Sequence, residues 1–309
     1  MRDSSGPVLA VIDLGTHTAL MVTGRRLADG RVEVLDDTHA IARLGKGVDA
    51  QRRISAETMD RVCRLLAEYR QRALGLGAEQ VRAFGTSALR DAANKAEFIA
   101  RVRQDAGLEL VEVSGSEEAG LTFRGAAFGL QLPSRYAVID IGGGSTEVAM
   151  GTGVQVEQSV SVDVGAVRVT ERCFPHLPPA PEEVARATEM VGAALNRLYP
   201  YPPDLPLVGV AGTVTTLGAI DLGIPRFDAE ELNGHFLSLT RVEEWSARLL
   251  SLPVDEIRRI PQVHEQRADI IGAGALILRL ALTRLGCPGL VVSTRGIRYG
   301  LLLRELGVD

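Results

Sequence analysis

The sequence is poor in cysteine, in aromatic residues and in lysine, and it has no long apolar run. Its three cysteines, Cys63, Cys173 and Cys287, are far apart and lack C-x-x-C spacing, so we expect reduced thiols and neither disulfides nor cysteine metal ligands. Aromatic residues make up 4% of the chain, which argues against a base-stacking surface for single-stranded nucleic acid. Because no 18-residue stretch is both uncharged and apolar, we expect no membrane-spanning helix.

Charge and the N-terminal residues exclude further function classes. The formal net charge is −5, so a broad basic surface for nucleic acid is not expected, and Lys46 and Lys95 are the only lysines among the basic residues. Residues 1–7 are polar, and Asp13 interrupts the apolar segment that follows them, which argues against a signal peptide. We therefore predict a cytoplasmic protein that binds neither membranes nor nucleic acid.

The stretch Asp-Ile-Gly-Gly-Gly-Ser-Thr-Glu at 140–147 follows the apolar residues 136–139 and has the composition of a phosphate-binding turn. Glycine lets a ligand approach the backbone closely, and successive free N–H groups in such a turn bind anions. The flanking carboxylates, Asp140 and Glu147, would repel a bare phosphate, so they indicate a divalent cation or an ordered water. Taken alone, the stretch is also compatible with an ordinary tight hairpin turn.

A near copy of this stretch occurs at the start of the chain. Ala-Val-Ile-Asp-Leu-Gly at 10–15 reappears as Ala-Val-Ile-Asp-Ile-Gly at 137–142, an offset of 140 − 13 = 127 residues. Both copies continue through hydroxyl residues into a second apolar stretch, so each predicts a strand, a phosphate-sized turn and another strand. Two related halves with such turns predict a phosphate-binding cleft between two domains.

A third turn of this kind follows the apolar residues 207–210. Gly212 and Thr213 stand at the start of an expected helix, whose N-terminus favours an anion. Together the three turns favour an α/β fold of two ribonuclease H-like domains, as in actin, Hsp70 and sugar kinases, with the active site in the interdomain cleft. Residues 132–134 are the best candidate boundary, which predicts an N-terminal domain at 1–132 and a C-terminal domain at 133–309.

Periodicity and capping signals predict individual elements. We expect a first hairpin at 8–13 and 19–25, a third strand at 32–36 and a glycine-punctuated loop at 39–49. Ser55 is the expected N-cap of a long helix, and capping boxes are expected at Asn94 with Glu97 and at Thr240 with Glu243. Later in the chain we expect a strand at 154–164 and a buried helix at 268–285.

Six blocks in order make the chain resemble the exopolyphosphatase/guanosine pentaphosphate phosphohydrolase (Ppx/GppA) family. The blocks cover nearly the whole chain and lie at 10–15, 86–94, 114–119, 140–147, 212–217 and 296–301. The resemblance implies a phosphoanhydride hydrolase that uses Mg²⁺ or Mn²⁺ to remove the terminal phosphate of inorganic polyphosphate. Hydrolysis of guanosine pentaphosphate (pppGpp) is the alternative within this class, and the family tends to form homodimers.

The resemblance also implies roles for individual residues. Glu118 is expected to orient or deprotonate the attacking water, and Arg90 to place a fixed cation on the transferred phosphoryl group. Metal ligation and organisation of water are expected from three carboxylates, Asp13, Asp140 and Glu147. Phosphate oxygens are expected to bind at Gly15, Thr16, Thr18, Gly142, Gly143, Gly144, Ser145, Gly212 and Thr213. Further polyanion contacts are expected from three arginines, Arg43, Arg267 and Arg298.

Two departures from the family pattern change these expectations. The first turn reads Thr16-His17-Thr18 where the family usually has an asparagine between the hydroxyls, so His17 replaces an amide and can titrate near neutral pH. The chain also lacks the helical C-terminal domains of longer members. This puts processive action on long polyphosphate in doubt and favours shorter chains or a nucleotide.

Two rival functions belong to other classes. A sensor that binds an alarmone or polyphosphate without turnover would share the binding loops, although retention of Glu118, Asp140 and Glu147 argues against it. An ATP-dependent sugar or acetate-type kinase needs an adenosine-pocket Gly-Gly, and Gly212-Thr213 lacks the second glycine. Binding without turnover would favour the sensor, and phosphorylation of an added acceptor would favour the kinase.

Overall fold

The computed structural model describes residues 6–202 and 204–308. Residues 1–5, on which the prediction of no signal peptide partly rests, lie outside them. The chain divides into two compact units. Unit 1 comprises Met1–Leu121 with Ile297–Asp309, and unit 2 comprises Thr122–Gly296.

Unit 1 is built on a five-stranded mixed sheet in the order β3-β2-β1-β4-β5. The central strand β1 reads Leu-Ala-Val-Ile-Asp-Leu and is buried along its whole length, as expected for a strand covered on both faces. It pairs antiparallel with β2 and parallel with β4. The strands are β1 (Leu9–Leu14), β2 (Thr18–Arg26), β3 (Val32–Ile41), β4 (Gln80–Gly85) and β5 (Leu110–Glu112).

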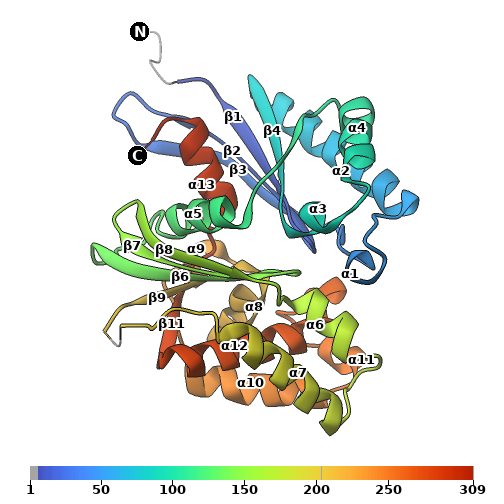
Figure 1. The fold of residues 1–309 in the computed structure, drawn as a ribbon. Helices are drawn as coiled ribbons and strands as arrows, with labels where there is room; N and C mark the ends of the chain where they lie inside the picture. The colour runs from blue at the N-terminus through green and yellow to red at the C-terminus, as the bar shows by residue number, and fades with distance from the viewer. Residues whose placement is uncertain (1–5, 203, 309) are drawn as a thin grey trace. The chain divides into compact units, whose positions relative to one another are not determined.

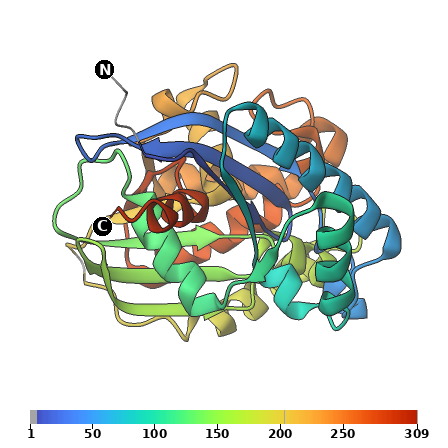
Figure 2. The same ribbon diagram turned by 90° about the horizontal axis from the view of Figure 1, so that it is seen from above.

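Helices cover both faces of the first sheet, and the long α2 begins at the N-cap that the sequence predicts. The Ser55 side chain accepts a hydrogen bond from the Thr58 backbone N–H, and the apolar side chains of α2 at a spacing of three to four residues enter the unit 1 core. Helix α13 packs along β1 and β2 (Figures 1 and 2). The helices are α1 (Val48–Gln51), α2 (Ala56–Gly75), α3 (Ser87–Asp91), α4 (Lys95–Arg101), the π-helical turn η1 (Val102–Ala106) and α13 (Ile297–Glu305). Helix α5 (Gly115–Ala126) runs through the division between the units.

Unit 2 contains a six-stranded mixed sheet in the order β10-β11-β9-β6-β7-β8. Helices α7, α10 and α12 gather over one face of this sheet (Figure 1), and α12 is mostly apolar and buried along most of its length. The strands are β6 (Arg135–Ile141), β7 (Thr146–Thr152), β8 (Gln155–Val162), β9 (Leu207–Val210), β10 (Phe236–Ser238) and β11 (Gly289–Val292). The helices are α6 (Ala166–Cys173), α7 (Pro181–Leu195), α8 (Ala211–Leu222), α9 (Ala229–Leu232), α10 (Leu239–Ser251), α11 (Val254–Ile257), the 3₁₀ turn η2 (Glu265–Arg267) and α12 (Ile271–Leu285).

The two sheets repeat the same hairpin at the offset seen in the sequence. Asp13 lies opposite Leu20 in the first hairpin, and Asp140 lies opposite Glu147 in the second, each 127 positions later. The register shift between strands also recurs, at Thr23/Gly24 in one sheet and Met150/Gly151 in the other. The internal repeat therefore extends beyond the sequence motif to strand pairing, with a carboxylate, Glu147, standing where the first copy has leucine.

Some predicted elements differ from the structure. Strand β3 continues to Ile41, through the start of the expected loop, because it pairs with β2 along the length of that strand. The Asn94 side chain does not cap α4; its amide binds the backbone N–H and carbonyl of Ile54 instead, at 2.9 and 3.0 Å. The expected capping box at Thr240 is wrong too, because α10 begins earlier, with Ser238 as its N-cap.

The boundaries of the compact units differ from the predicted domain ranges at two places. Residues 122–132 belong with unit 2, where Phe123 stacks on Tyr136 with ring centroids 4.4 Å apart. The C-terminal helix α13 belongs with unit 1, since its side chains pack on β1 and β2. A linear sequence pattern does not reveal this return of the chain.

No helix within residues 6–202 and 204–308 is both long enough and apolar enough to cross a lipid bilayer. A cytoplasmic location stays a prediction of the sequence.

Close packing at Gly300 gives a test of the helix that closes unit 1. A Cβ added at Gly300 would lie 1.9 Å from the carbonyl oxygen of Leu121. Because backbone must shift to accept it, we expect Gly300→Ala to lower the free energy of unfolding by about 1–3 kcal/mol in a urea titration. Gly192→Ala is the control: nothing lies within 4 Å of a Cβ at this α7 position, so the added methyl group should stabilise by about 0.5–1 kcal/mol. Equal stability of the two variants would contradict the packing seen at Gly300.

Candidate active site

The first predicted phosphate turn is the three-residue link, 15–17, between β1 and β2. The Gly15 N–H donates to the carbonyl of Thr18 at 2.9 Å, which closes the turn. The segment 42–45 binds the carbonyls of Thr16 and His17 in this turn. The Gly45 N–H donates to the Thr16 carbonyl at 2.9 Å, and the N–H groups of residues 42 and 43 donate to the His17 carbonyl at 2.9 and 2.8 Å. A Cβ at Gly45 would lie 2.2 Å from Thr16 Cγ2, so a larger residue there would require the Thr16 side chain to move.

The second turn, between β6 and β7, has the same geometry in unit 2. The Gly142 N–H donates to Ser145 at 3.0 Å, and the first turn of α6 binds the carbonyls of Gly142 and Gly143 at 2.9–3.1 Å. Among the described residues, the backbone N–H groups of Gly143, Gly144 and Ser145 have no hydrogen-bond acceptor. Three successive donors of this kind form the anion-binding concavity that the sequence predicts.

A pair of buried carboxylates stands beside the second turn. Asp140 and Glu147 are 9% and 3% exposed and lie directly opposite each other on β6 and β7, which places their Cβ atoms about 4.5–5.5 Å apart. Ser161 Oγ donates to Glu147 at 2.7 Å, and Thr122 Oγ1 donates to Asp140 at 3.5 Å. Neither hydroxyl was singled out in the sequence, because the pairing of β7 with β8 and the start of unit 2 at Thr122 bring them there.

This donor set fits Mg²⁺ or Mn²⁺ of the kind that proteins hold with one or two carboxylates and substrate oxygens. It does not form an all-protein metal cage, since no three His, Cys, Asp or Glu side chains gather as a metal-holding group in the described part of the chain. Asp13, the third predicted ligand, ends β1 of unit 1 and is 5% exposed. Its role as a ligand stays a prediction.

Unit 1 brings the two predicted catalytic side chains together. Arg90 Nη1 donates to Glu118 Oε2 at 2.6 Å and to the Val113 carbonyl at 2.8 Å. Two acidic residues near Arg90 in the sequence form other ion pairs: Asp91 with Arg52 and Glu97 with Arg53, each at 3.5 Å. Because Nη1 makes both contacts, Nη2 and Nε of Arg90 keep no partner among the described residues and remain available to an anion.

Glu118 is a buried carboxylate with a raised pKa. Burial raises the pKa of Glu118 above its ordinary value of 4.5, while the charge of Arg90 and hydrogen bonds from Arg90 and Thr86 lower it. Its neighbour Glu117 points elsewhere and pairs with Arg304 at 2.8 Å. The two adjacent glutamates therefore have different environments, and only Glu118 has the character of a candidate general base.

The third predicted turn places a bare cation at a helix start. Arg267 lies against Gly212 so closely that a Cβ there would be 1.3 Å from Nη1. Burial lowers the pKa of Arg267 to about 10, and its guanidinium has no ion pair or hydrogen bond within the described residues. The Thr213 side chain packs against Gly274 of α12, so only its backbone N–H is placed to serve an anion.

The two remaining predicted arginines lie in unit 1. Arg298 forms a two-pronged ion pair with Asp37 at 2.7 and 2.8 Å, and Tyr299 donates to the same carboxylate at 2.8 Å. Such a pair is typical of a structural role, and contact with substrate stays a prediction for Arg298 as for Arg43. Arg43 adopts a left-handed backbone (φ 45°) in the segment that binds the first turn.

One buried cation was not identified from the sequence. Arg168, in the first turn of α6, is 5% exposed and donates from Nε to the Gly144 carbonyl at 2.7 Å. The signal was present in Gly-Ala-Val-Arg at 165–168, directly after the strand that pairs with β7. A Cβ at Gly165 would lie 2.5 Å from the Gly143 carbonyl carbon, so glycine is required for α6 to approach the turn.

Each unit thus carries groups suited to phosphate chemistry. Unit 1 has the Glu118–Arg90 pair and the first turn, and unit 2 has the free N–H groups, the carboxylate pair and Arg267. These groups can bind a phosphate chain, neutralise its charge and position a water. The interdomain cleft itself stays a prediction of the sequence.

Comparison with known proteins agrees with this chemistry. The chain matches the Ppx/GppA phosphatase family over residues 25–308. It is 34% identical over 318 residues to exopolyphosphatase 2 of Mycobacterium tuberculosis, covering 97% of this chain and 98% of that protein.

Solved structures of similar fold point the same way. The Aquifex aeolicus member of the Ppx/GppA family superposes with a TM-score of 0.82 at 30% identity, covering 97% of each chain. An exopolyphosphatase from Cytophaga hutchinsonii superposes with a TM-score of 0.86 at 25% identity, covering 98% of this chain and 99% of that one. The fold is the actin-like, ribonuclease H-like arrangement of two domains, and the chain is a phosphoanhydride hydrolase that belongs to the Ppx/GppA phosphatase family.

Proposed function

We propose that this protein removes the terminal orthophosphate from inorganic polyphosphate, preferring shorter chains, with a divalent metal ion. The observation that carries the proposal is the turn at 142–145, which offers three unengaged N–H groups beside the buried Asp140–Glu147 pair. This is a site for an anion accompanied by a cation, as a terminal phosphate with Mg²⁺ would be. The name of the Mycobacterium tuberculosis relative, exopolyphosphatase 2, supports polyphosphate as the substrate.

The side chains divide the work of hydrolysis. Glu118 accepts the proton of the attacking water or fixes its orientation, and Arg90 holds the Glu118 carboxylate while its Nη2 and Nε groups are available to bind an anion. The N–H groups of 143–145 bind the oxygens of the phosphoryl group. Asp140 and Glu147 would hold the metal ion, which neutralises charge on the phosphate oxygens when bound. Arg267 and the start of α8 would bind a phosphate further along the chain.

The roles of the adjacent glutamates give the first prediction. We expect Glu118→Gln to lower kcat by about two to four orders of magnitude, the usual effect of losing a positioned acid–base group, with KM little changed. Release of orthophosphate from tripolyphosphate, from long-chain polyphosphate and from pppGpp measures this and identifies the preferred substrate. Glu117→Gln is the matched control, since Glu117 pairs with Arg304 and should be replaceable without loss of rate.

Three results of that assay would contradict parts of the proposal. A near-normal rate for Glu118→Gln would remove Glu118 from the mechanism. Turnover of pppGpp alone would replace polyphosphate by the nucleotide. Tight binding of all three compounds without turnover, unaffected by Glu118→Gln, would make the protein a sensor.

Burial of Glu118 gives a pH dependence with a definite sign. A protonated Glu118 cannot accept a proton, so activity falls as the pH drops through its pKa. Because burial raises that pKa, the acid limb of kcat/KM should lie above pH 4.5, the ordinary value for glutamate. Arg90→Met removes the charge that lowers the pKa, and should move the limb to still higher pH. An acid limb at the same pH in both proteins would show that Glu118 is not the group that titrates.

The carboxylate pair predicts how the metal is held. We expect chelation with EDTA to abolish hydrolysis and added Mg²⁺ or Mn²⁺ to restore it. Glu147→Gln should raise the Mg²⁺ concentration for half-maximal rate by about 10–100-fold, the cost of disturbing a metal site. Glu157→Gln, on the neighbouring strand β8 but paired with Arg135 at the surface, should leave that concentration unchanged. Full activity in EDTA, or equal Mg²⁺ dependence of both variants, would count against a metal at Asp140 and Glu147.

A further inference from the structure

Arg168 occupies a position that is unfavourable for a cation by itself. It lies in the first turn of α6, where the helix dipole favours negative charge, and it is 5% exposed. Removing a guanidinium from water is costly unless it binds something in return. What its Nε binds is the carbonyl of Gly144, at 2.7 Å.

Because the peptide bond is planar, the direction of the Gly144 carbonyl also sets the direction of the Ser145 N–H group. In a trans peptide, the C=O of one residue and the N–H of the next point in opposite directions. Fixing the carbonyls of 142, 143 and 144 therefore fixes the N–H groups of Gly143, Gly144 and Ser145. The backbone of α6 reaches only the first two of these carbonyls, and the Arg168 side chain supplies the donor for the third.

The first turn meets the same requirement by other means. Its corresponding carbonyls, at Thr16 and His17, accept hydrogen bonds from backbone N–H groups of the segment 42–45. Two segments with unrelated sequences thus bind equivalent carbonyls of both turns from outside. The glycines of the second turn allow its peptides to rotate more easily, so the need for a fixed donor is greater there.

We propose that Arg168 is a positioning residue that holds the Gly144–Ser145 peptide with its N–H group toward the substrate phosphate. The inference rests on the proposed function, since it assigns Arg168 to the phosphate site of the same hydrolase. Without Arg168, the peptide is free to rotate and to present a carbonyl oxygen where the anion binds. The consequence is weaker binding of phosphate, with less effect on the chemical step.

The test compares Arg168→Met and Arg168→Lys with wild-type protein. Calorimetric titration with tripolyphosphate in EDTA measures anion binding without turnover, and steady-state assays with Mg²⁺ separate KM from kcat. We expect Arg168→Met to weaken tripolyphosphate binding and to raise KM by about 10-fold or more, the effect of losing one hydrogen bond to a charged ligand, with a smaller change in kcat. Arg168→Lys, which keeps a cationic donor, should recover most of the affinity.

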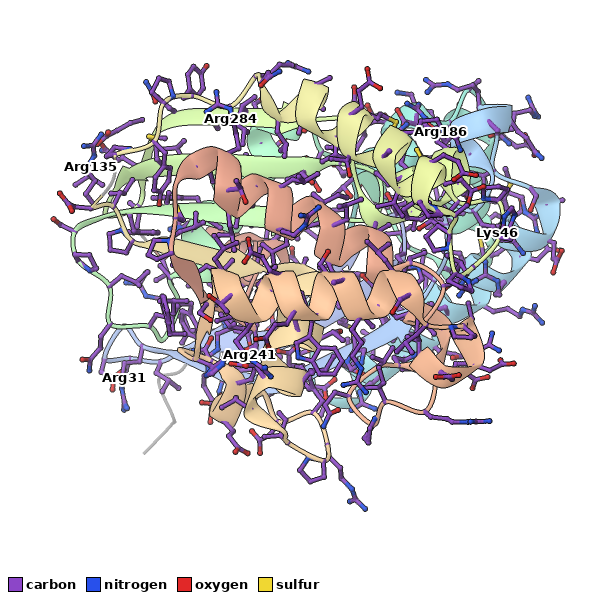
Figure 3. All side chains as sticks on the ribbon, turned by 90° about the horizontal axis from the view of Figure 1, so that it is seen from below. Arg31, Lys46, Arg135, Arg186, Arg241 and Arg284 are labelled. Carbon is purple, nitrogen blue, oxygen red and sulfur yellow. The ribbon has the colours of Figure 1, made fainter. Side chains whose placement is uncertain are left out.

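Arg284→Met controls for the loss of one positive charge from unit 2. Arg284 is exposed in the last turn of α12 (Figure 3) and has no partner among the described residues, so its removal should leave both KM and binding unchanged. Circular dichroism and thermal melting establish that each variant is folded. If Arg168→Met does not fold, Arg168→Lys decides: it should fold normally and still bind tripolyphosphate more weakly than wild type.

The outcomes separate this inference from the proposed function. Folded Arg168 variants whose binding and KM equal those of wild type would overturn the role of Arg168 while leaving hydrolysis intact. A wild-type protein that binds tripolyphosphate but never hydrolyses it would overturn the proposed activity, and the binding comparison would still test Arg168. A wild-type protein that binds no tripolyphosphate, with or without Mg²⁺, would overturn both.

Discussion

A backbone turn that binds an anion must keep its carbonyl oxygens away from that anion, and the structure depends on this constraint in both units. Every peptide carries a donor and an acceptor that point in opposite directions, so free N–H groups on one side require satisfied carbonyls on the other. The first turn is held by the segment 42–45, and the second by α6 and the Arg168 side chain. Gly45 and Gly165 allow these holding segments to approach, because a Cβ at either would clash with the turn.

The carboxylates discussed above differ in their partners: some form ion pairs with arginine, and others lie beside the phosphate-binding turn. Asp37 is bound by Arg298 and Tyr299, and Glu117 is bound by Arg304. These partners neutralise both carboxylates within unit 1. Asp140 and Glu147 lie opposite each other on neighbouring strands and accept hydrogen bonds from the hydroxyls of Thr122 and Ser161. Two like charges held so close favour a bound cation, which is the electrostatic reason for proposing a metal ion there.

Much of the fold followed from the sequence because its signals are local or repeated. The Ser55 cap, the strand β1 and the strand-to-helix turn at Gly212 were predicted and are present. The repeat at an offset of 127 residues predicted two hairpins, and the structure confirms both and shows that they share the same register. The capping box at Asn94 was wrong because that side chain meets the backbone of Ile54, 40 positions earlier in the chain, a contact no local pattern encodes.

The candidate site shows the same limit. The pairing of Arg90 with Glu118, the burial of Arg168 and the hydroxyls on Asp140 and Glu147 are tertiary contacts between segments 14–28 positions apart. The sequence indicated Arg90, Glu118, Asp140 and Glu147 but not the partners that these side chains would contact. The sequence analysis assigned no role to Gly-Ala-Val-Arg at 165–168, and the contact between Arg168 and the Gly144 carbonyl became apparent only in the structure.

The central claim is that the turn at 142–145 binds phosphate through its backbone N–H groups. Nuclear magnetic resonance of protein labelled with ¹⁵N in glycine and serine tests it most directly, because the amide signals of Gly143, Gly144 and Ser145 report on those groups. Titration with orthophosphate should shift these three signals together along one binding curve, while Gly192 on α7 stays still. Saturable phosphate binding that leaves all three signals unmoved would contradict the account.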